Sequence, residues 1–378
     1  MIIVHVLTRL LKAGSEENTY LSAVAQRRAG HDVYVVYGAE ADPGQVQAWG
    51  RDLAMVQISS MVHPLNPLKD ARATLDMARQ FRRLKPDIVH THQSKAGIVG
   101  RMAARLAGVK TVIHGVHIIP FEQVGFARKL VYLSAEHLCA SLTHAFVHVS
   151  ESSRQTYIDK GIGKSLPHAV VRSGMDLGRF RNAQWPADWQ AITGASDPAS
   201  VPPVLLLIGA LEPRKRHLEL IAALKVSKFR PDNLLVLFAG TGPMESQVRA
   251  AIAEAGLESQ IRLLGFRRDP ESLIALSRAC LSVGEREGLP RVVIQYLAGN
   301  RPAFVTRTMG LDRLIAEHPL CSVYAPEDMQ GQVDDACRAL SAPVAAEQSG
   351  DTVRLLDAWD VPAFVQGLEQ VYTGARTR

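Results

Sequence analysis

The feature that most constrains this sequence is an alternation of short apolar runs and helical stretches. In its first half the apolar runs lie at residues 2–7, 33–37, 88–90 and 112–114. Apolar runs of this kind are typical of parallel strands that are buried on both faces. The stretches between them with helical character are residues 19–28, 69–84 and 95–106. Such alternation predicts a doubly wound α/β sheet with helices on both faces.

The alternation stops at residues 182–203, a stretch that holds four prolines. It then restarts, with apolar runs at residues 204–208, 234–239, 261–264, 279–283 and 303–306. We therefore predict two domains of similar build, residues 1–182 and 203–355, facing a cleft. Residues 356–378 hold a final amphipathic helix that we expect to pack back toward the first domain. Ligands of open α/β sheets bind beyond the carboxyl ends of the strands, so the functional residues are expected just after strands.

The composition and the cysteines narrow the class of protein. Apolar residues make up 47 % and charged residues 21 %, as in soluble globular proteins. The first seven residues are too short and lack the cationic start of a signal peptide, and no run of about 18 apolar residues could span a membrane. The four cysteines have neither metal-ligand nor redox spacing. We therefore expect a cytoplasmic, reducing location.

The net charge of +6 is unevenly distributed. Residues 65–131 hold twelve Lys/Arg and four Asp/Glu. A basic face could meet anionic lipid headgroups, which would place the protein at the inner face of the cytoplasmic membrane, or a phosphorylated acceptor. The alternative is a solvated helix surface, because Arg79, Arg82, Arg83 and Lys85 stand at a helix end, where cations suit the helix dipole. Nucleic acid is disfavoured, since no aromatic residues interleave with the basic ones.

Two groups of residues in the first domain follow strands. Gly14 and Ser15 come after the first strand, where a glycine lets the backbone approach a phosphate or a sugar. The further glycines of a dinucleotide fingerprint and the Gly-Lys-Ser/Thr of a P-loop are missing, so a bare turn fits equally well. A histidine group follows two later strands: His90, His92, His114 and His117. We expect hydrogen bonds to a polar substrate or interior roles rather than a metal site, because fitting carboxylates and cysteines are absent.

In the second domain, three loops follow strands. Arg214, Lys215 and Arg216 crowd the loop after residue 208, where cations would stabilise a leaving diphosphate or lie solvated. Gly242 lies in the next loop, as a turn residue or a ligand contact.

The third loop carries Glu287, Gly288, Leu289 and Pro290, followed by a helix at residues 291–298. Pro290 suits the first helical position, and the helix start offers backbone amides to an anion. Glu287 could accept hydrogen bonds from sugar hydroxyls. Gln295 lies two helical turns further on, on a helix face from which it could contact the same ligand.

Together these motifs resemble glycosyltransferase family 4. The resemblance covers nearly the whole chain and rests on residues 5–18, 89–97, 114–117, 171–176 and, most specifically, 287–290. It implies the GT-B fold of two Rossmann-like domains. It also implies retaining, hexosyltransferase-type transfer from a UDP- or GDP-sugar to a glycan or polyprenyl-linked acceptor of cell-surface polysaccharide synthesis, without a metal or other cofactor.

The resemblance also implies roles for single residues. Gly14, with Ser15 beside it, would approach the donor diphosphate, and His117 would contact the transferred sugar. Lys215, with Arg214 nearby, would neutralise the leaving diphosphate.

The remaining implied roles fall on the second domain. Glu287 would hold sugar hydroxyls, the amides of Gly288 and Leu289 would bind phosphate, and Gln295 would reach the ribose. The loop after Gly265, with Phe266 and Arg267, would lie near the base.

Three positions depart from the family pattern. Ala210 stands where the family usually has an arginine, Gln295 where it has a second glutamate, and Gly284 where it has a serine. Gln295 can still hydrogen-bond ribose, whereas Ala210 removes one of two charges, worth about 1.5–3 kcal/mol. These departures keep a second hypothesis open, a GT-B binding or scaffold protein with impaired catalysis. A sugar-nucleotide epimerase of similar build would not account for the whole-chain pattern.

Overall fold

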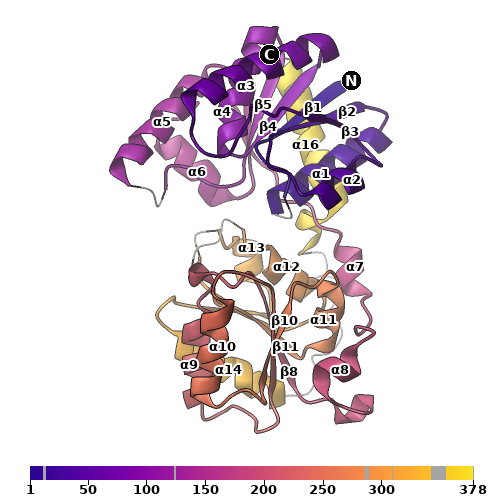
Figure 1. Cartoon of the computed structure of the whole chain (residues 1–378), viewed down its shortest axis with the longest axis vertical. Helices are drawn as coiled ribbons and strands as arrows, with labels where there is room; N and C mark the ends of the chain where they lie inside the picture. Colours follow the sequence, from indigo (N-terminus) through magenta and orange to yellow (C-terminus); the bar gives the residue numbers. More distant parts are fainter. Residues whose placement is uncertain (12–13, 123–124, 286–288, 309, 342–354, 378) are drawn as a thin grey trace. The chain divides into compact units, whose positions relative to one another are not determined.

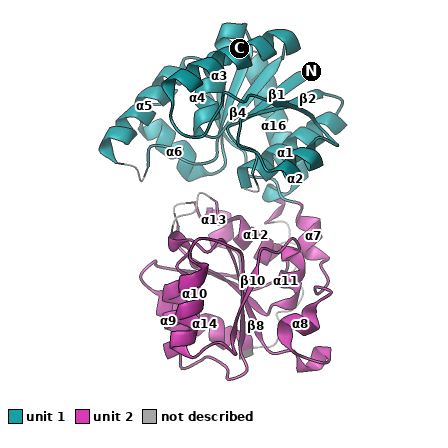
Figure 2. Ribbon diagram, viewed as in Figure 1, with its two compact units in different colours: residues 1–175, 358–378 teal, residues 176–357 magenta. Residues whose placement is uncertain are grey.

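The computed structural model of this chain describes residues 1–378 except 12–13, 123–124, 286–288, 309, 342–354 and 378. The chain forms two compact units, residues 1–175 with 358–378 and residues 176–357 (Figures 1 and 2). Each unit is built on one parallel sheet covered by helices, as the alternation predicts.

The first unit holds a seven-stranded sheet of order β3-β2-β1-β4-β5-β6-β7. Its strands are β1 (Ile2–Leu7), β2 (Asp32–Tyr37), β3 (Ala54–Gln57), β4 (Ile88–His92), β5 (Thr111–Val116), β6 (Ala145–His148) and β7 (His168–Val170). Its helices are α1 (Gly14–Arg28), α2 (Pro43–Trp49), α3 (Pro67–Leu84), α4 (Ser94–Ala107), α5 (Phe126–Ala140), α6 (Glu151–Asp159) and α16 (Val361–Arg376). The strand order reverses between β1 and β4, which defines the switch point of this sheet.

Alternation along β1 separates the two faces of this sheet. Val4 and Val6 pack against α3 and α4, whereas Ile3 and Leu7 belong to the opposite face. The final helix α16 covers that opposite face, where Phe364, among others, joins the core cluster of Ile3.

The second unit holds a six-stranded sheet of order β10-β9-β8-β11-β12-β13. Its strands are β8 (Val204–Ile208), β9 (Leu235–Ala239), β10 (Ile261–Gly265), β11 (Ala279–Ser282), β12 (Ala303–Thr306) and β13 (Cys321–Tyr324). Its helices are α7 (Leu177–Arg181), α8 (Trp189–Thr193), α9 (His217–Val226), α10 (Glu245–Ala255), α11 (Pro270–Leu276), α12 (Arg291–Ala298), α13 (Arg313–Ala316) and α14 (Met329–Ser341). The described residues also form the short 3-10 turns η1 (Pro198–Ser200), η2 (Pro213–Lys215) and η3 (Asp357–Trp359), the last at the return to the first unit.

The boundary between the units differs from the predicted one. The first unit was predicted to end at residue 182, but the chain enters the second unit at Asp176. The Asp176 carboxylate accepts a hydrogen bond from the Arg179 backbone N–H and so caps α7, which packs on α11 and α12. Trp185 then donates from Nε1 to the Ala275 carbonyl at 3.1 Å. The proline-rich stretch is therefore held by the second unit rather than lying between two domains.

Two further observations concern the apolar character of the helices and the state of the cysteines. None of the helices in the described part of the chain is both long and apolar enough to cross a bilayer. All four cysteines are free thiols, and three of them are buried. Burial raises the pKa of the Cys280 thiol to about 12, so this cysteine stays protonated and serves as a small apolar side chain.

Candidate functional site

The predicted site residues of the second unit that the structure describes follow the carboxyl ends of β8, β9, β10 and β11. The strand order of this sheet reverses between β8 and β11, which makes this edge its switch point. Glu287 and Gly288, the centre of the most specific motif, lie outside the described residues.

The loops after β8 and β9 are joined through their backbones. The Leu211 N–H donates to the Thr241 carbonyl at 3.0 Å. A Cβ on Gly242 would lie 2.3 Å from the Leu211 carbonyl oxygen, and one on Gly240 would lie 2.0 Å from that of Gly209. The structure thus gives Gly242 a packing role between two loops, in agreement with a turn residue. No ligand is needed to explain this glycine.

Lys215 ends the 3-10 turn η2 and lies back over the end of β8. Its Cδ and Cε atoms lie 3.6 and 3.7 Å from the position that a Cβ of Gly209 would take. Since Gly209 directly follows β8, the ammonium group is held near the carboxyl end of this central strand. That is the place where a cation can meet a diphosphate.

The two arginines beside Lys215 have different surroundings. Arg214 donates from Nε to Glu212 Oε2 at 2.7 Å, and its carbonyl accepts from the Glu285 N–H at 3.1 Å. Arg216 has a left-handed backbone, φ 55°, and donates to the Pro326 carbonyl at 2.7 Å. Arg214 therefore lies where the loops after β8 and β11 touch, while Arg216 is directed toward the loop after β13.

Helix α12 is anchored to the same strand. The Ile208 N–H donates to the Tyr296 hydroxyl at 2.9 Å, which ties α12 to the end of β8. Pro290, predicted at the first helical position, instead occupies the N-cap, and the helix starts at Arg291. Leu289 precedes this cap, and the half-buried Gln295 lies on α12 within one turn of Tyr296.

The loop after β10 carries the two residues predicted near a base. Phe266 is 58 % exposed. Arg267 forms ion pairs with Asp188 and Asp269, both at 2.7 Å, and these carboxylates raise the pKa of its guanidinium. Four hydrogen bonds run from this guanidinium to the two carboxylates. Arg267 thus ties the segment of α8 to this loop, and a base contact by the same group would compete with these bonds.

At the switch point of the first unit, Gly14 is the first residue of α1 rather than part of a preceding loop. Ser15 Oγ donates to Glu16 Oε2 at 2.5 Å and accepts from Gln93 Nε2 at 3.3 Å. Gln93 Oε1 in turn accepts from the Thr8 N–H at 2.9 Å. The amide of Gln93 therefore connects the loop after β1 to the start of α1.

Gln93 is a residue whose position sequence reasoning missed. It lies between β4 and α4 with φ 63° and ψ 166°, a backbone conformation that residues other than glycine rarely adopt. Strain of this kind persists where surrounding contacts hold a side chain in place. A glutamine after a strand carries no sequence signal for it.

Four histidines of the first unit lie together on the sheet face under α1 and α16: His5, His90, His92 and His117. His5 contacts Gln26 through Nε2 at 2.8 Å and His92 through Nδ1 at 2.9 Å. His92 Nδ1 contacts His117 Nε2 at 2.9 Å. Beside them, His90 Nδ1 contacts the Tyr372 hydroxyl at 2.7 Å. His5, which the sequence did not single out, therefore belongs to the group.

Burial keeps these imidazoles neutral. Desolvation lowers the pKa of His5 to about 4. It also holds the pKa values of His90 and His92 well below the ordinary value, with neighbouring histidines adding to the effect. Interior roles, one of the two interpretations left open for His90 and His92, fit both side chains, and His5 is buried beside them.

The same three histidines offer nitrogen atoms within 4.8 Å of one another, a separation at which metal ligands occur. Zn–N bonds of about 2.0–2.1 Å in tetrahedral geometry separate ligand nitrogens by about 3.3 Å. His5 Nδ1 and His92 Nε2 lie only 2.9 Å apart, with ring planes 18° apart, which fits a hydrogen bond better than a shared ion.

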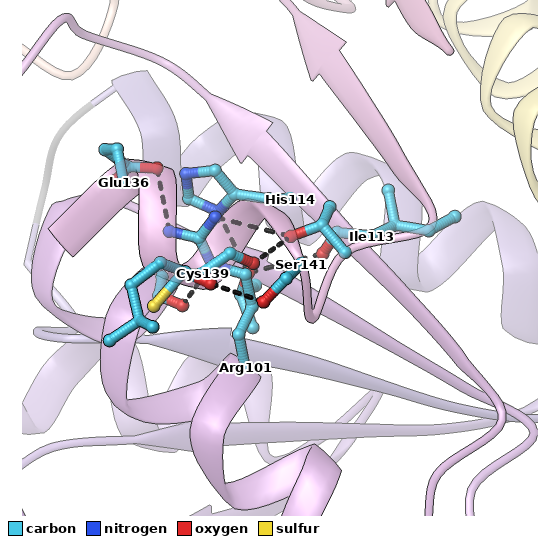
Figure 3. A network of polar contacts seen from close by, with 10 residues as sticks. Arg101, Ile113, His114, Glu136, Cys139 and Ser141 are labelled. Atoms are coloured by element: carbon cyan, nitrogen blue, oxygen red, sulfur yellow. Dashed lines mark hydrogen bonds and ion pairs between the residues drawn. The ribbon is translucent and has the colours of Figure 1, made fainter. Parts of the chain in front are cut away.

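On the opposite face of the same strands, His114 lies beside a buried ion pair. Arg101 NH2 and Glu136 Oε2 are 2.9 Å apart, and both side chains are almost fully buried. Arg101 also donates from Nε to the Gly97 carbonyl at 2.7 Å. Figure 3 shows this network from close by, with His114 next to Arg101. His114, His117 and Glu136 are among the residues that line a small pocket beside this network.

Two of the cations in the basic stretch, residues 65–131, are buried in ion pairs. Of the twelve cations in residues 65–131, Arg101 pairs with Glu136 in the core, and the buried Lys95 pairs with Asp70 at 2.6 Å. The surface charge of this stretch is therefore smaller than its sequence suggests.

Comparison with known protein families divides the chain in two. The family described as "Glycosyl transferase 4-like domain" matches residues 13–174, and that described as "Glycosyl transferases group 1" matches residues 191–350. The boundary between these matches falls close to the division between the two units.

Individual relatives agree with these families. The UDP-Gal:alpha-D-GlcNAc-diphosphoundecaprenol alpha-1,3-galactosyltransferase of Escherichia coli is 27 % identical over 264 residues, 68 % of this chain and 67 % of that one. The putative glycosyltransferase EpsD of Bacillus subtilis is 26 % identical over 239 residues, 61 % of each chain.

Solved structures resemble the whole chain in fold. HepE of Anabaena, crystallised in complex with UDP, has a TM-score of 0.78 at 16 % identity, over 99 % of this chain and 100 % of that one. A glycosyltransferase from Rickettsia africae has a TM-score of 0.79 at 16 % identity, over 99 % and 98 % of the two chains.

Proposed function

The chain belongs to glycosyltransferase family 4 and has the GT-B fold, and on this basis we propose that it is a retaining hexosyltransferase. It moves a sugar from a UDP- or GDP-sugar to a glycan or lipid-linked acceptor during cell-surface polysaccharide synthesis. A UDP-sugar is the favoured donor, because the Escherichia coli relative is named for UDP-Gal and HepE was crystallised with UDP.

One observation in the second unit carries this proposal furthest. The loops after β8 and β11 meet at the switch point through the Glu285–Arg214 backbone bond, with Lys215 held over Gly209. When the bond between the sugar and the diphosphate breaks, negative charge grows on the leaving phosphate. A cation fixed beforehand at that place lowers the barrier, because it needs no reorganisation.

The other donor contacts are assigned by family resemblance. We propose that Glu287 binds the sugar hydroxyls, that the amides of Gly288 and Leu289 bind phosphate, and that Gln295 binds the ribose. Gly14 and Ser15 approach the diphosphate, and His117 contacts the transferred sugar. Phe266, which is exposed beside β10, provides a surface for the base.

Retention at the anomeric carbon is the stereochemical part of the proposal. The name of the Escherichia coli relative describes transfer from UDP-Gal to an alpha-1,3 linkage. UDP-galactose carries its sugar in α linkage, so that reaction keeps the configuration. The same outcome is proposed for this chain.

We further propose that the first unit meets the membrane surface that carries the acceptor. Helix α5 exposes Phe126, Leu130, Val131 and Leu138, and the exposed Arg128 lies among them. Apolar side chains with interleaved cations suit the boundary between headgroups and acyl chains. Binding to vesicles with anionic lipid, and its weakening in Phe126→Ser/Leu130→Ser, tests this; equal binding by both proteins would contradict it.

The activity is tested with UDP-galactose and a GlcNAc-diphosphate-lipid acceptor, with release of UDP and NMR of the product linkage as readouts. We expect an α-linked product. Glu287→Ala should lower turnover at least about tenfold, since it removes a contact of about 1.4 kcal/mol or more. Full activity in this variant would contradict the site assignment.

The proposal also includes independence from metal ions, so EDTA should leave the rate unchanged. An impaired binding protein is the competing function, suggested by Ala210 and Gln295. Calorimetry with UDP and GDP separates the two. Absence of nucleotide binding together with absence of donor hydrolysis would favour the binding protein.

A further inference from the structure

The histidine line of the first unit, defined as Gln26, His5, His92 and His117, leads from the interior to a proposed sugar contact. Its three contacts measure 2.8, 2.9 and 2.9 Å. Gln26, His5 and His92 are at most 3 % exposed. A neutral imidazole has one N–H and one nitrogen without a proton, so each contact needs a donor on one side and an acceptor on the other. The direction of one contact therefore decides the direction of the next.

The inner end of the line sets this direction. In the structure Gln26 donates from Nε2 to the Tyr372 hydroxyl at 3.2 Å, and its Oε1 lies 2.8 Å from His5 Nε2 and accepts from it. His5 Nδ1 then carries no proton and accepts from His92 Nε2. His92 Nδ1 in turn accepts from His117 Nε2. Each step follows from the one before, because every ring is limited to one proton.

We propose that His5 and His92 are positioning residues that hold His117 in the Nε2–H tautomer. His117 Nδ1 then accepts a hydrogen bond from a hydroxyl of the transferred sugar. The sugar contact rests on the proposed function, whereas the tautomer rests only on the contacts of the line. Neutrality is essential, since a second proton on any ring would turn an acceptor into a donor. Burial supports it by lowering the pKa values of His5 and His92.

Gly115 leaves the space that this arrangement occupies. A Cβ at this position would lie 3.0 Å from His92 Nδ1 and 3.3 Å from His117 Nε2, the two atoms of the outermost contact. It would also lie 3.1 Å from His90 Nε2, an atom without a hydrogen-bond partner among the described residues. A side chain at position 115 would therefore crowd the contact between His92 and His117, and glycine leaves room for the two rings to bond directly.

The tautomer can be read directly by NMR. In protein labelled with 15N-histidine, long-range proton–nitrogen spectra distinguish protonated from unprotonated ring nitrogens, and the loss of signals in His117→Gln identifies His117. We expect Nε2–H and an unprotonated Nδ1 in the free protein. His5→Phe removes the acceptor for His92 and should give a mixture of tautomers. His5→Asn keeps an acceptor at the Nδ1 position and should restore the single tautomer.

The first unit offers a matched control. His148 and His168 form a histidine contact of the same length, 2.9 Å, with ring planes 19° apart, and neither belongs to the line. His168→Gln should leave the His117 signals unchanged. This variant separates a general loss of histidine packing from an effect of the line.

Kinetics with UDP-galactose complete the test. His5→Phe should lower kcat/KM about three- to tenfold, the loss expected for one neutral hydrogen bond. His5→Asn should recover the rate to within about twofold of the native protein.

Three results would overturn the proposal: an Nδ1–H tautomer in the native protein, an unchanged tautomer in His5→Phe, or stoichiometric zinc that is lost in His90→Gln. Absence of glycosyl transfer would count against the proposed function alone, because the tautomer is read without substrate.

Discussion

The switch points of the two sheets have the same topology and opposite chemistry. In the first unit the edge between β1 and β4 is occupied by neutral, buried histidines whose hydrogen bonds run to one another. In the second unit the loops at the carboxyl ends of β8 and β11 meet beside Lys215 and Arg214, and glycines let the loop backbones approach each other closely. A doubly wound sheet therefore fixes where a ligand binds, while the side chains after the strands decide its charge. In the proposed function, the second unit binds the diphosphate here and the first unit contacts sugar hydroxyls.

Acidification should separate the stabilities of the two units most strongly, because most histidines with a lowered pKa lie in the first unit. In the first unit desolvation lowers the pKa values of five well-buried histidines: His5, His90, His92, His114 and His148. In the second unit the same effect is resolved for His217. A histidine with a depressed folded pKa favours the unfolded state as pH falls below its unfolded value near 6.5.

Each such histidine costs about 1 kcal/mol between pH 6.5 and 5.5, so the first unit should lose up to about 5 kcal/mol and the second about 1 kcal/mol. Hydrogen exchange followed by mass spectrometry at the two pH values measures each unit separately. Equal loss of protection in both units would contradict the prediction.

Removal of one partner from the buried ion pair is the next largest effect. Arg101→Met leaves the Glu136 carboxylate buried without its cation, which should cost about 3–5 kcal/mol of unfolding free energy. Urea denaturation measures the loss. The double variant Arg101→Met/Glu136→Leu removes both charges and should recover most of the stability. No recovery would mean that packing, rather than charge, accounts for the loss.

Lys215→Ala tests the cationic edge of the second unit. It should lower turnover at least about tenfold, or 1.4 kcal/mol, and leave thermal stability unchanged. The matched control is Arg249→Ala, which removes an exposed cation on α10 that pairs with Glu245. Steady-state kinetics with UDP-galactose should show a normal rate for the control. A similar rate loss in both variants would point to net charge rather than to the position of Lys215.

The smallest effect is expected at Arg267, whose ion pairs lie at the surface. The Asp188 partner is 49 % exposed, so Arg267→Leu should lower the unfolding free energy by less than about 1 kcal/mol. Thermal shift measures this change, and calorimetry with UDP shows whether the guanidinium contacts the base. A loss of UDP affinity of tenfold or more would show that Arg267 contacts the donor although it also pairs with Asp188 and Asp269.

The sequence predicted the buried part of the fold well and its margins poorly. The runs that became β1, β8 and β12 were predicted with their bounds, because strands buried on both faces are continuously apolar. Edge strands such as β3 and β13 are short and partly exposed, so they lack that pattern. The unit boundary was misplaced because the packing of α7 on α11 and α12 depends on contacts between distant segments.

The same limit applies to the candidate site. The position of Lys215 after β8 was predictable, because the apolar run of that strand shows where the loop begins. Its contact with a diphosphate stays a prediction. The role of Gln93 was not predictable, since it depends on a backbone conformation and on two partners distant in sequence. His5 was passed over because a single histidine within an apolar strand resembles an ordinary interior residue. Only the sheet register brings it beside His90.

The return of α16 to the first unit has a consequence for the order in which the protein is made. The core cluster of Ile3 and Ile88 includes Phe364, Leu368 and Tyr372, which leave the ribosome only after residues 176–357. At roughly 5–20 residues per second, translation of residues 176–357 takes on the order of 10–40 s. During that time the first unit exposes the apolar face that α16 will cover, because α16 follows the whole second unit in the sequence. The first unit therefore completes its core only after the second unit has been made.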